Sequence, residues 1–146
     1  MKLLITSDVH GHEERLKEVI DIHKDVDAHL NAGDMCLDQR VYQKYHLITV
    51  KGNNDFFTNE PFKRVINLFG INILLTHGHI EHVKFSKKEI KALGEHLEAD
   101  LVIFGHTHQR YIEKIGDMVL INPGALGDFE KSYAIYEDGE ITFYQL

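Results

Sequence analysis

The sequence is poor in cysteine and proline and has no long apolar run. Cys36 is the only cysteine, which rules out an intramolecular disulfide and suits a reducing compartment. We expect this thiol to be a small buried hydrophobe. The longest apolar run, Leu68 to Leu75, is interrupted by a glycine and an asparagine and is far too short to span a membrane. The N-terminal apolar stretch before Ser7 is too short for the core of a signal peptide, so we expect a cytoplasmic protein.

What the sequence does contain is the composition of an ordinary folded protein. Its 146 residues are 43% apolar and 27% charged, so a single domain over residues 1–146 can bury a sizeable core. The formal net charge of -7 would repel polyanions, which makes long nucleic acids unexpected partners. A small phosphate ester could still be held if bound metals supplied positive charge. The composition leaves open whether copies of the chain form a homo-oligomer.

The first half of the chain alternates short apolar strands with polar loops and a helix. A strand over Lys2 to Thr6 is followed by a helix over His12 to Lys24, whose apolar residues recur at steps of three and four. Further strands are predicted at Ala28 to Ala32 and at Leu47 to Val50. This alternation of strand, loop and helix predicts an α/β layer arrangement.

The second half predicts paired strands and one more helix. Strands over Arg64 to Phe69 and Ile71 to Thr76 are joined at a glycine, and another strand is expected at Leu101 to Phe104. Ser86 and Glu89 have the spacing of a capping box, in which both side chains satisfy free amides at a helix start. Two hairpins are predicted after these elements, Tyr111 to Ile115 with Met118 to Ile121, and Tyr133 to Tyr136 with Ile141 to Tyr144.

Five of the predicted strands are followed by side chains that bind metals. These are Asp8 and His10 after the first strand, then Asp34, then Asn53, then His77, and finally His106 and His108. Ligands gather at the carboxyl ends of strands in α/β sheets, so these residues can meet at one edge of the fold. Carboxylates, imidazoles and an amide without any thiolate suit divalent manganese, iron, cobalt, nickel or zinc. Seven candidates exceed the four ligands of a structural zinc site, which favours two metals that share one carboxylate.

Taken singly, each of these motifs has an ordinary structural interpretation. The Gly33-Asp34 pair and the segment from Gly52 to Asp55 are typical of turns, and two histidines in one loop can simply be exposed. Their coincidence at five strand ends favours a metal site. Residue His79 could line the same pocket or be an exposed loop residue. The other histidines are predicted on helix faces or on the surface, namely His12, His23, His29, His46, His82 and His96.

The order Asp-x-His-Gly, Gly-Asp, Gly-Asn-x-Asp, His-Gly-His and Gly-His-Thr-His resembles the calcineurin-like metallophosphoesterases, in particular their small bacterial and archaeal branch. The resemblance covers nearly the whole chain and includes Asn122-Pro123-Gly124, although Ala125 stands where a serine often follows. It implies a four-layer α/β/β/α sandwich of two mixed β-sheets flanked by helices. It also implies two divalent metal ions per chain, with manganese expected first and nickel, cobalt, iron or zinc as alternatives.

The resemblance further implies how the ligands divide between the two metals. One metal would be held by Asp8, His10 and His108, and the other by Asn53, His77 and His106, with Asp34 as the bridge. The implied activity is hydrolysis of small phosphodiesters with good leaving groups, through attack by a hydroxide that bridges the metals.

One departure from the family pattern concerns catalysis. Relatives with strong phosphatase activity usually have a histidine after the metal-binding asparagine, whereas this chain has Asn54, and the small prokaryotic branch often lacks that histidine too. An amide can orient a phosphate oxygen but cannot deliver a proton near neutral pH. We therefore expect Asn54 and Asp34 to act in catalysis and leaving groups to be good ones. The alternatives are a non-catalytic or weakly active metal-binding scaffold of the same fold, and a mononuclear metal hydrolase.

Overall fold

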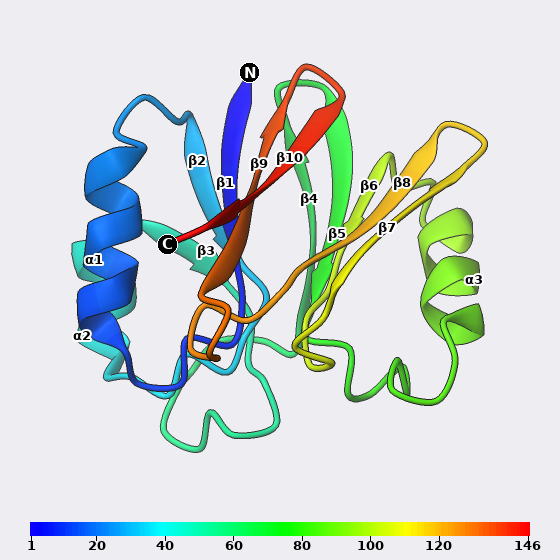
Figure 1. Ribbon diagram of the computed structural model, residues 1–146. Helices are drawn as coiled ribbons and strands as arrows, with labels where there is room; N and C mark the ends of the chain where they lie inside the picture. Colours follow the sequence, from blue (N-terminus) through cyan, green and yellow to red (C-terminus); the bar gives the residue numbers. More distant parts are fainter.

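Two mixed five-stranded sheets pack face to face in the computed structural model, which describes residues 1–146 (Figure 1). The first sheet has the order β10-β9-β1-β2-β3 and the second the order β4-β5-β6-β8-β7. The strands of the first sheet are β1 (Lys2–Thr6), β2 (Ala28–Asn31), β3 (Leu47–Thr49), β9 (Ser132–Glu137) and β10 (Glu140–Gln145). Those of the second are β4 (Lys63–Leu68), β5 (Ile71–Thr76), β6 (Leu101–Ile103), β7 (Arg110–Ile115) and β8 (Met118–Pro123).

Three helices cover the outer faces of the sheets. Helices α1 (Glu13–Ile22) and α2 (Gln39–Lys44) contribute Leu16, Val41 and Tyr42 to a core cluster against the first sheet. Helix α3 (Lys88–His96) packs Ile90 onto the second sheet. A third cluster, which includes Leu3, Leu30, Ile73 and Ile103, fills the space between the sheets. The predicted four-layer α/β/β/α sandwich is therefore confirmed.

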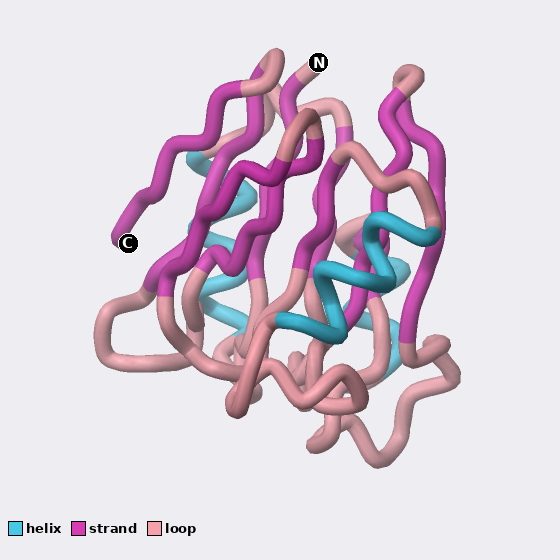
Figure 2. The backbone as a smooth tube through the Cα atoms, turned by 90° about the vertical axis from the view of Figure 1, so that its right-hand side faces the viewer, coloured by secondary structure: helices cyan, strands magenta, loops and turns pink.

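The parallel strands determine where the polar loops meet. Strands β1, β2 and β3 are parallel neighbours in one sheet, and β5, β6 and β8 are parallel neighbours in the other. Their carboxyl ends point to the same end of the sandwich, the lower end in Figure 1, and Figure 2 shows the longer loops gathered there. Groups from both sheets can therefore face one another across this end.

The bounds predicted from the sequence differ from those of the structure by no more than two residues, but one helix was missed. Helix α2 has only six residues and follows Asp38, whose carboxylate accepts a hydrogen bond from the amide of Arg40. The predicted capping box does not form, because Ser86 accepts from the amide of Lys88 while Glu89 lies beside His82. None of the helices is long and apolar enough to cross a membrane.

Two predicted environments are also wrong. Cys36 is exposed in a loop rather than buried, because its backbone is held by a hydrogen bond to the carboxylate of Asp55. His29 is neither on a helix face nor on the surface. It lies on β2, is 6% exposed, and its Nε2 is 2.7 Å from the hydroxyl of Thr6.

Candidate metal centre

The seven predicted ligands lie in the loops that follow β1, β2, β3, β5 and β6. Asp8 is fully buried, and its Oδ1 has no hydrogen-bond partner in the protein. This oxygen lies 3.5 Å from Nε2 of His10 and 3.3 Å from Nε2 of His108. The three side chains form one group whose donor atoms could surround a single ion.

A second group, deeper in the protein, joins Asp8 to Asp34 and His77, all three of which are buried. Oδ2 of Asp34 lies 3.3 Å from Nε2 of His77 and 3.9 Å from Nε2 of His10, so it faces both groups. His106 completes this side, with its Nδ1 3.2 Å from Nε2 of His77.

The two consecutive asparagines of the β3 loop differ in what they contact. The side chain of Asn53 is exposed and makes no hydrogen bond to the protein. Asn54, by contrast, donates from its backbone amide to Oδ1 of Asp34 and from its side chain to Oδ2, both at 2.9 Å. The structure therefore places Asn54 directly against the carboxylate that was predicted to bridge.

The loops reach this arrangement through strained backbone and close contacts. Asp8, His10, Asp34, His106 and His108 all have φ between 48° and 70°, the left-handed region that residues with a Cβ rarely adopt. Two glycines permit the close approach of neighbouring loops, since a Cβ at Gly52 would overlap Asp34 and one at Gly105 would overlap Ser7.

Two polar side chains hold these loops in place. The buried carboxylate of Asp55 accepts from the backbone amides of Asp34, Cys36 and Gly52, which fixes the β2 and β3 loops to each other. The amide of Asn122 donates to the carbonyl of Gly105 and to the hydroxyl of Thr107, both at 3.0 Å, and so supports the histidine loop after β6.

Further contacts orient the two histidines that face the carboxylates. Nδ1 of His77 lies 2.7 Å from the carbonyl oxygen of Ala32, so Nδ1 carries a proton and Nε2 is the nitrogen that can bind a metal. Nδ1 of His108 lies 3.2 Å from Oδ2 of Asp128 and is oriented in the same way. Histidines that bind metals are typically fixed by such partners.

Sequence reasoning missed two of these supporting residues. Asp128 has no recognisable motif around it, and it meets His108 only because β8 and β9 return the chain to the site. Asp55 was visible at the end of the Gly-Asn-x-Asp motif, but its role as an acceptor for three amides depends on long-range contacts.

Groups of opposite charge lie close together in the site and shift each other's pKa. Burial alone would raise the pKa of Asp8, but contacts with His10 and His108 outweigh it and hold that pKa well below its usual range. Burial lowers the pKa of His77, yet the Asp34 and Asp8 carboxylates reverse this and raise it. The pKa of His106 is lowered to about 4, by burial first and then by the neighbouring His77 charge. The site therefore favours ionised carboxylates, the form that binds metal.

His79, whose place the sequence left open, lies beside the centre. Its ring is half-buried, with its centroid 5.5 Å from that of His77 and 6.1 Å from that of His106. Its buried Nδ1 has no hydrogen-bond partner in the protein. The structure thus favours a half-buried residue beside the metal centre over an exposed loop residue.

Comparisons with known proteins identify the family of this chain. The model of the calcineurin-like phosphoesterase superfamily domain matches residues 1–138. The chain belongs to this superfamily. It is 34% identical over 127 residues to the probable metallophosphoesterase YsnB of Bacillus subtilis (strain 168), which covers 86% of this chain and 75% of that protein.

Two further relatives have a named activity or a solved structure. This chain is 30% identical to phosphodiesterase MJ0936 of Methanocaldococcus jannaschii, over 85% of this chain and 83% of that protein. The crystal structure of a predicted phosphoesterase from Streptococcus pneumoniae TIGR4 superposes with a TM-score of 0.88 at 28% identity and covers 99% of this chain and 88% of that one.

The residues of this phosphoesterase-superfamily chain fit a divalent metal. The buried Oδ1 of Asp8 lacks any hydrogen-bond partner, and such an atom is costly to bury unless an ion or a donor satisfies it. Ring nitrogens of His77 and His106 lie 3.2 Å apart, and those of His10 and His108 lie 3.3 Å apart. Both pairs of imidazoles lie beside ionised carboxylates. Nitrogen and oxygen donors without sulfur match borderline divalent ions.

Proposed function

We propose that this protein is a phosphodiesterase that hydrolyses small phosphodiesters with good leaving groups and uses two divalent metal ions, manganese first among them. The observation that carries the proposal is the unpartnered Oδ1 of buried Asp8 between two groups of donors. One group contains His10 and His108, the other Asp34 and His77. Asn53 and His106 complete the predicted set of seven. The cytoplasmic location also stays a prediction.

The division of labour follows from where each residue lies. When bound, the metals would neutralise phosphate charge and supply hydroxide from water near neutral pH. Asp34 faces both donor groups and would tie them together. The amide of Asn54 must exchange its bond to Asp34 for one to a phosphate oxygen, and it then orients the substrate without donating a proton. This is why we expect good leaving groups.

The decisive experiment is substitution of Asp34 by alanine. We expect the variant to lose bound metal and to lose at least about 10³-fold in hydrolysis of bis(p-nitrophenyl) phosphate, since the substrate charge is then left unneutralised. Metal content is measured by elemental analysis and turnover by p-nitrophenolate release. Substitution of the exposed Asp117 in the β7–β8 turn by alanine serves as the matched control and should change neither. Full activity in metal-depleted wild-type protein would contradict the proposal.

The same measurements separate the proposal from its two rivals. A metal-binding scaffold without turnover is favoured by one observation, the absence of a histidine at Asn54. It predicts two metals per chain and no hydrolysis of the activated diester. A mononuclear hydrolase predicts one metal per chain with turnover. Two metals with turnover support the proposed function.

A further inference from the structure

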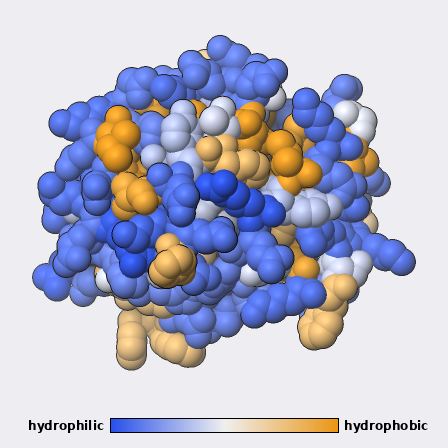
Figure 3. All heavy atoms as spheres, in the orientation of Figure 1, coloured by the Kyte–Doolittle hydropathy of each residue, from blue (hydrophilic) through white to orange (hydrophobic).

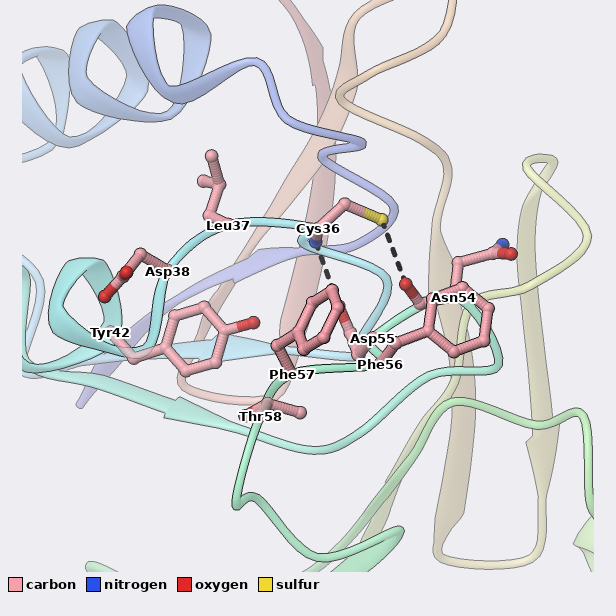
Figure 4. A pocket seen from close by; sticks show the side chains of 9 residues that line it. All are labelled: Cys36, Leu37, Asp38, Tyr42, Asn54, Asp55, Phe56, Phe57 and Thr58. Carbon is pink, nitrogen blue, oxygen red and sulfur yellow. Dashed lines mark hydrogen bonds between the residues drawn. The ribbon is translucent and has the colours of Figure 1, made fainter.

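A cavity of about 470 Å³ opens beside the metal centre between the β2 loop, helix α2 and the β3 loop (Figure 4). Cys36 and Asn54 lie on one side of it, and Asp38 and Tyr42 on the other. The volume is in the range of pockets that hold small organic ligands. The lining residues not yet named are Leu37, Asp55, Phe56, Phe57 and Thr58.

The walls of this cavity are aromatic, and two of its rings are exposed to water. Phe57 is 96% exposed and Phe56 is 73% exposed, whereas Tyr42 is buried and closes one side. Figure 3 shows apolar side chains that project from a mostly hydrophilic surface at the end of the molecule where the site loops lie. Adjacent exposed aromatic rings on a charged surface mark a binding site more often than isolated ones do.

The loop that carries these rings is held firmly at its base. Asp55 immediately precedes Phe56, and its carboxylate accepts from the amides of Asp34, Cys36 and Gly52. Thr58, on the other side of Phe57, is buried and donates to Gln39 of helix α2 at 2.6 Å. The two rings are therefore presented from a fixed backbone, which reduces the entropy lost when a ligand binds.

The cavity adjoins the metal centre through two of its lining residues. Asn54 lines it and also bonds Asp34 through both its amides. The thiol of Cys36 lies 3.9 Å from Nδ1 of His10 and 3.7 Å from the carbonyl of Asn54. A phosphate held at Asn54 would thus have the cavity next to it, within reach of one of its ester groups.

The charges around the cavity indicate which ester group fits. Its only charged side chains are Asp38 and Asp55, so an anionic group would be repelled. A second cavity, about 320 Å³ in volume, is lined instead by basic side chains, which include Lys84, Lys87 and Arg110. The acidic and aromatic cavity suits an uncharged planar ring, whose face can stack on phenylalanine.

We propose that the cavity lined by Tyr42, Phe56 and Phe57 is the subsite for an uncharged aromatic arm of the phosphate ester. This proposal rests on the proposed function, because it assumes that the phosphate sits at the metal centre. It makes Phe57 the main determinant of substrate preference, since that ring has no packing role of its own.

The test uses two inert probes, phenylphosphonate and methylphosphonate, which differ only in the aromatic arm. Binding to the manganese-loaded full chain is measured by calorimetry. We expect the wild type to bind phenylphosphonate about tenfold more tightly, since stacking and burial of one ring are worth about 1.4 kcal/mol or more. Phe57→Ala should reduce this preference to about twofold or less and leave methylphosphonate binding unchanged. Phe57→Tyr, which keeps the ring, should retain it.

Phe85→Ala is the matched control, because Phe85 is 89% exposed in a loop at the same end of the sandwich but does not line the cavity. It should keep the full preference. Equal binding or no binding of phenylphosphonate by the wild type, or an unchanged preference in Phe57→Ala, would overturn the proposal. The proposal would also be overturned if light scattering showed that Phe57→Ala loses a dimer while the preference for phenylphosphonate stays intact. The rings would then form an interface between copies of the chain. Failure of the proposed function alone would instead appear as aromatic preference without hydrolysis.

Discussion

The two donor groups of the metal centre differ in how they are held. In the deep group, His77 is fully buried and its Nδ1 is fixed by the backbone carbonyl of Ala32. In the outer group, His108 is 36% exposed and its Nδ1 is oriented by the side chain of Asp128, itself 51% exposed. One half of the site is thus part of the core, whereas the orientation of His108 in the other half depends on a surface carboxylate. If each half holds one metal, as proposed, we expect the deep half to bind it more tightly and to exchange it more slowly.

Replacement of His77 by alanine should have the largest effect. It removes a donor, leaves the carbonyl of Ala32 unpaired and leaves two buried carboxylates without their neighbour. We expect loss of at least one metal per chain and a fall of about 2–4 kcal/mol in the free energy of unfolding of the metal-free protein. Urea denaturation and elemental analysis measure both. Unchanged stability would show that the deep half does not contribute to the core.

Replacement of Asp128 by alanine should affect the outer half alone. Loss of such an orienting carboxylate typically weakens metal binding by about 10- to 100-fold. A metal titration followed by calorimetry should show one site weakened and the other unchanged, with unaltered stability to urea. Replacement of the exposed Asp117 provides the control for loss of one surface charge. Equal weakening of both sites would erase the distinction between the halves.

The residues that support the deep half should make the stability of the protein depend on pH, through His29. This side chain bonds Thr6, which accepts from Asn31, and Asn31 in turn accepts from the amide of Gly33 just before Asp34. Burial lowers the pKa of His29 from 6.5 to about 3, so below pH 6.5 the unfolded chain binds the extra proton and the folded chain does not. Stability is therefore complete above pH 6.5 and decreases as the pH falls towards 3.

The expected loss from this one group is about 2 kcal/mol between pH 7 and pH 5. Urea denaturation of metal-free wild type and of a His29→Gln variant at both pH values isolates it, because glutamine can bond Thr6 but does not titrate. The variant should lose less stability on acidification by that amount. Parallel losses in the two proteins would show that the buried network is not the acid-sensitive element.

The smallest expected effect concerns Asn54, where the two halves meet the substrate. Replacement by histidine adds a group that can donate a proton, so hydrolysis of diesters with poor leaving groups should rise by about tenfold or more. Hydrolysis of bis(p-nitrophenyl) phosphate, whose leaving group needs no proton, should change little. A uniform increase for both substrates would mean that Asn54 limits phosphate orientation and not proton transfer.

Much of the fold and of the site could be predicted from the sequence because the signals are local. Apolar runs followed by glycine and polar residues located the strands that end at the centre, and the order of motifs located the seven candidate ligands. Helix α2 was missed because six mostly polar residues show no helical periodicity. Its start depends on a contact between Asp38 and the amide of Arg40, which no repeat in the sequence indicates.

What could not be predicted depends on residues that meet only after folding. Asp128 reaches His108, Asp55 collects three amides, and His29 finds Thr6 on the neighbouring strand. Cysteine is a residue type that is common in protein cores, but Cys36 lies exposed in a loop next to the site. Pairings of this kind are set by strand order and register, which the local pattern does not contain.

The left-handed backbone at Asp8, His10, Asp34, His106 and His108 has a consequence for the history and engineering of this chain. Each such residue costs about 1–2 kcal/mol relative to glycine, so five of the seven candidate ligands oppose folding. Selection for stability alone would replace them with glycine and erase the centre. Thermostability screens run without an activity filter should therefore enrich inactive variants at these positions, and a stabilised catalyst has to be sought elsewhere in the chain.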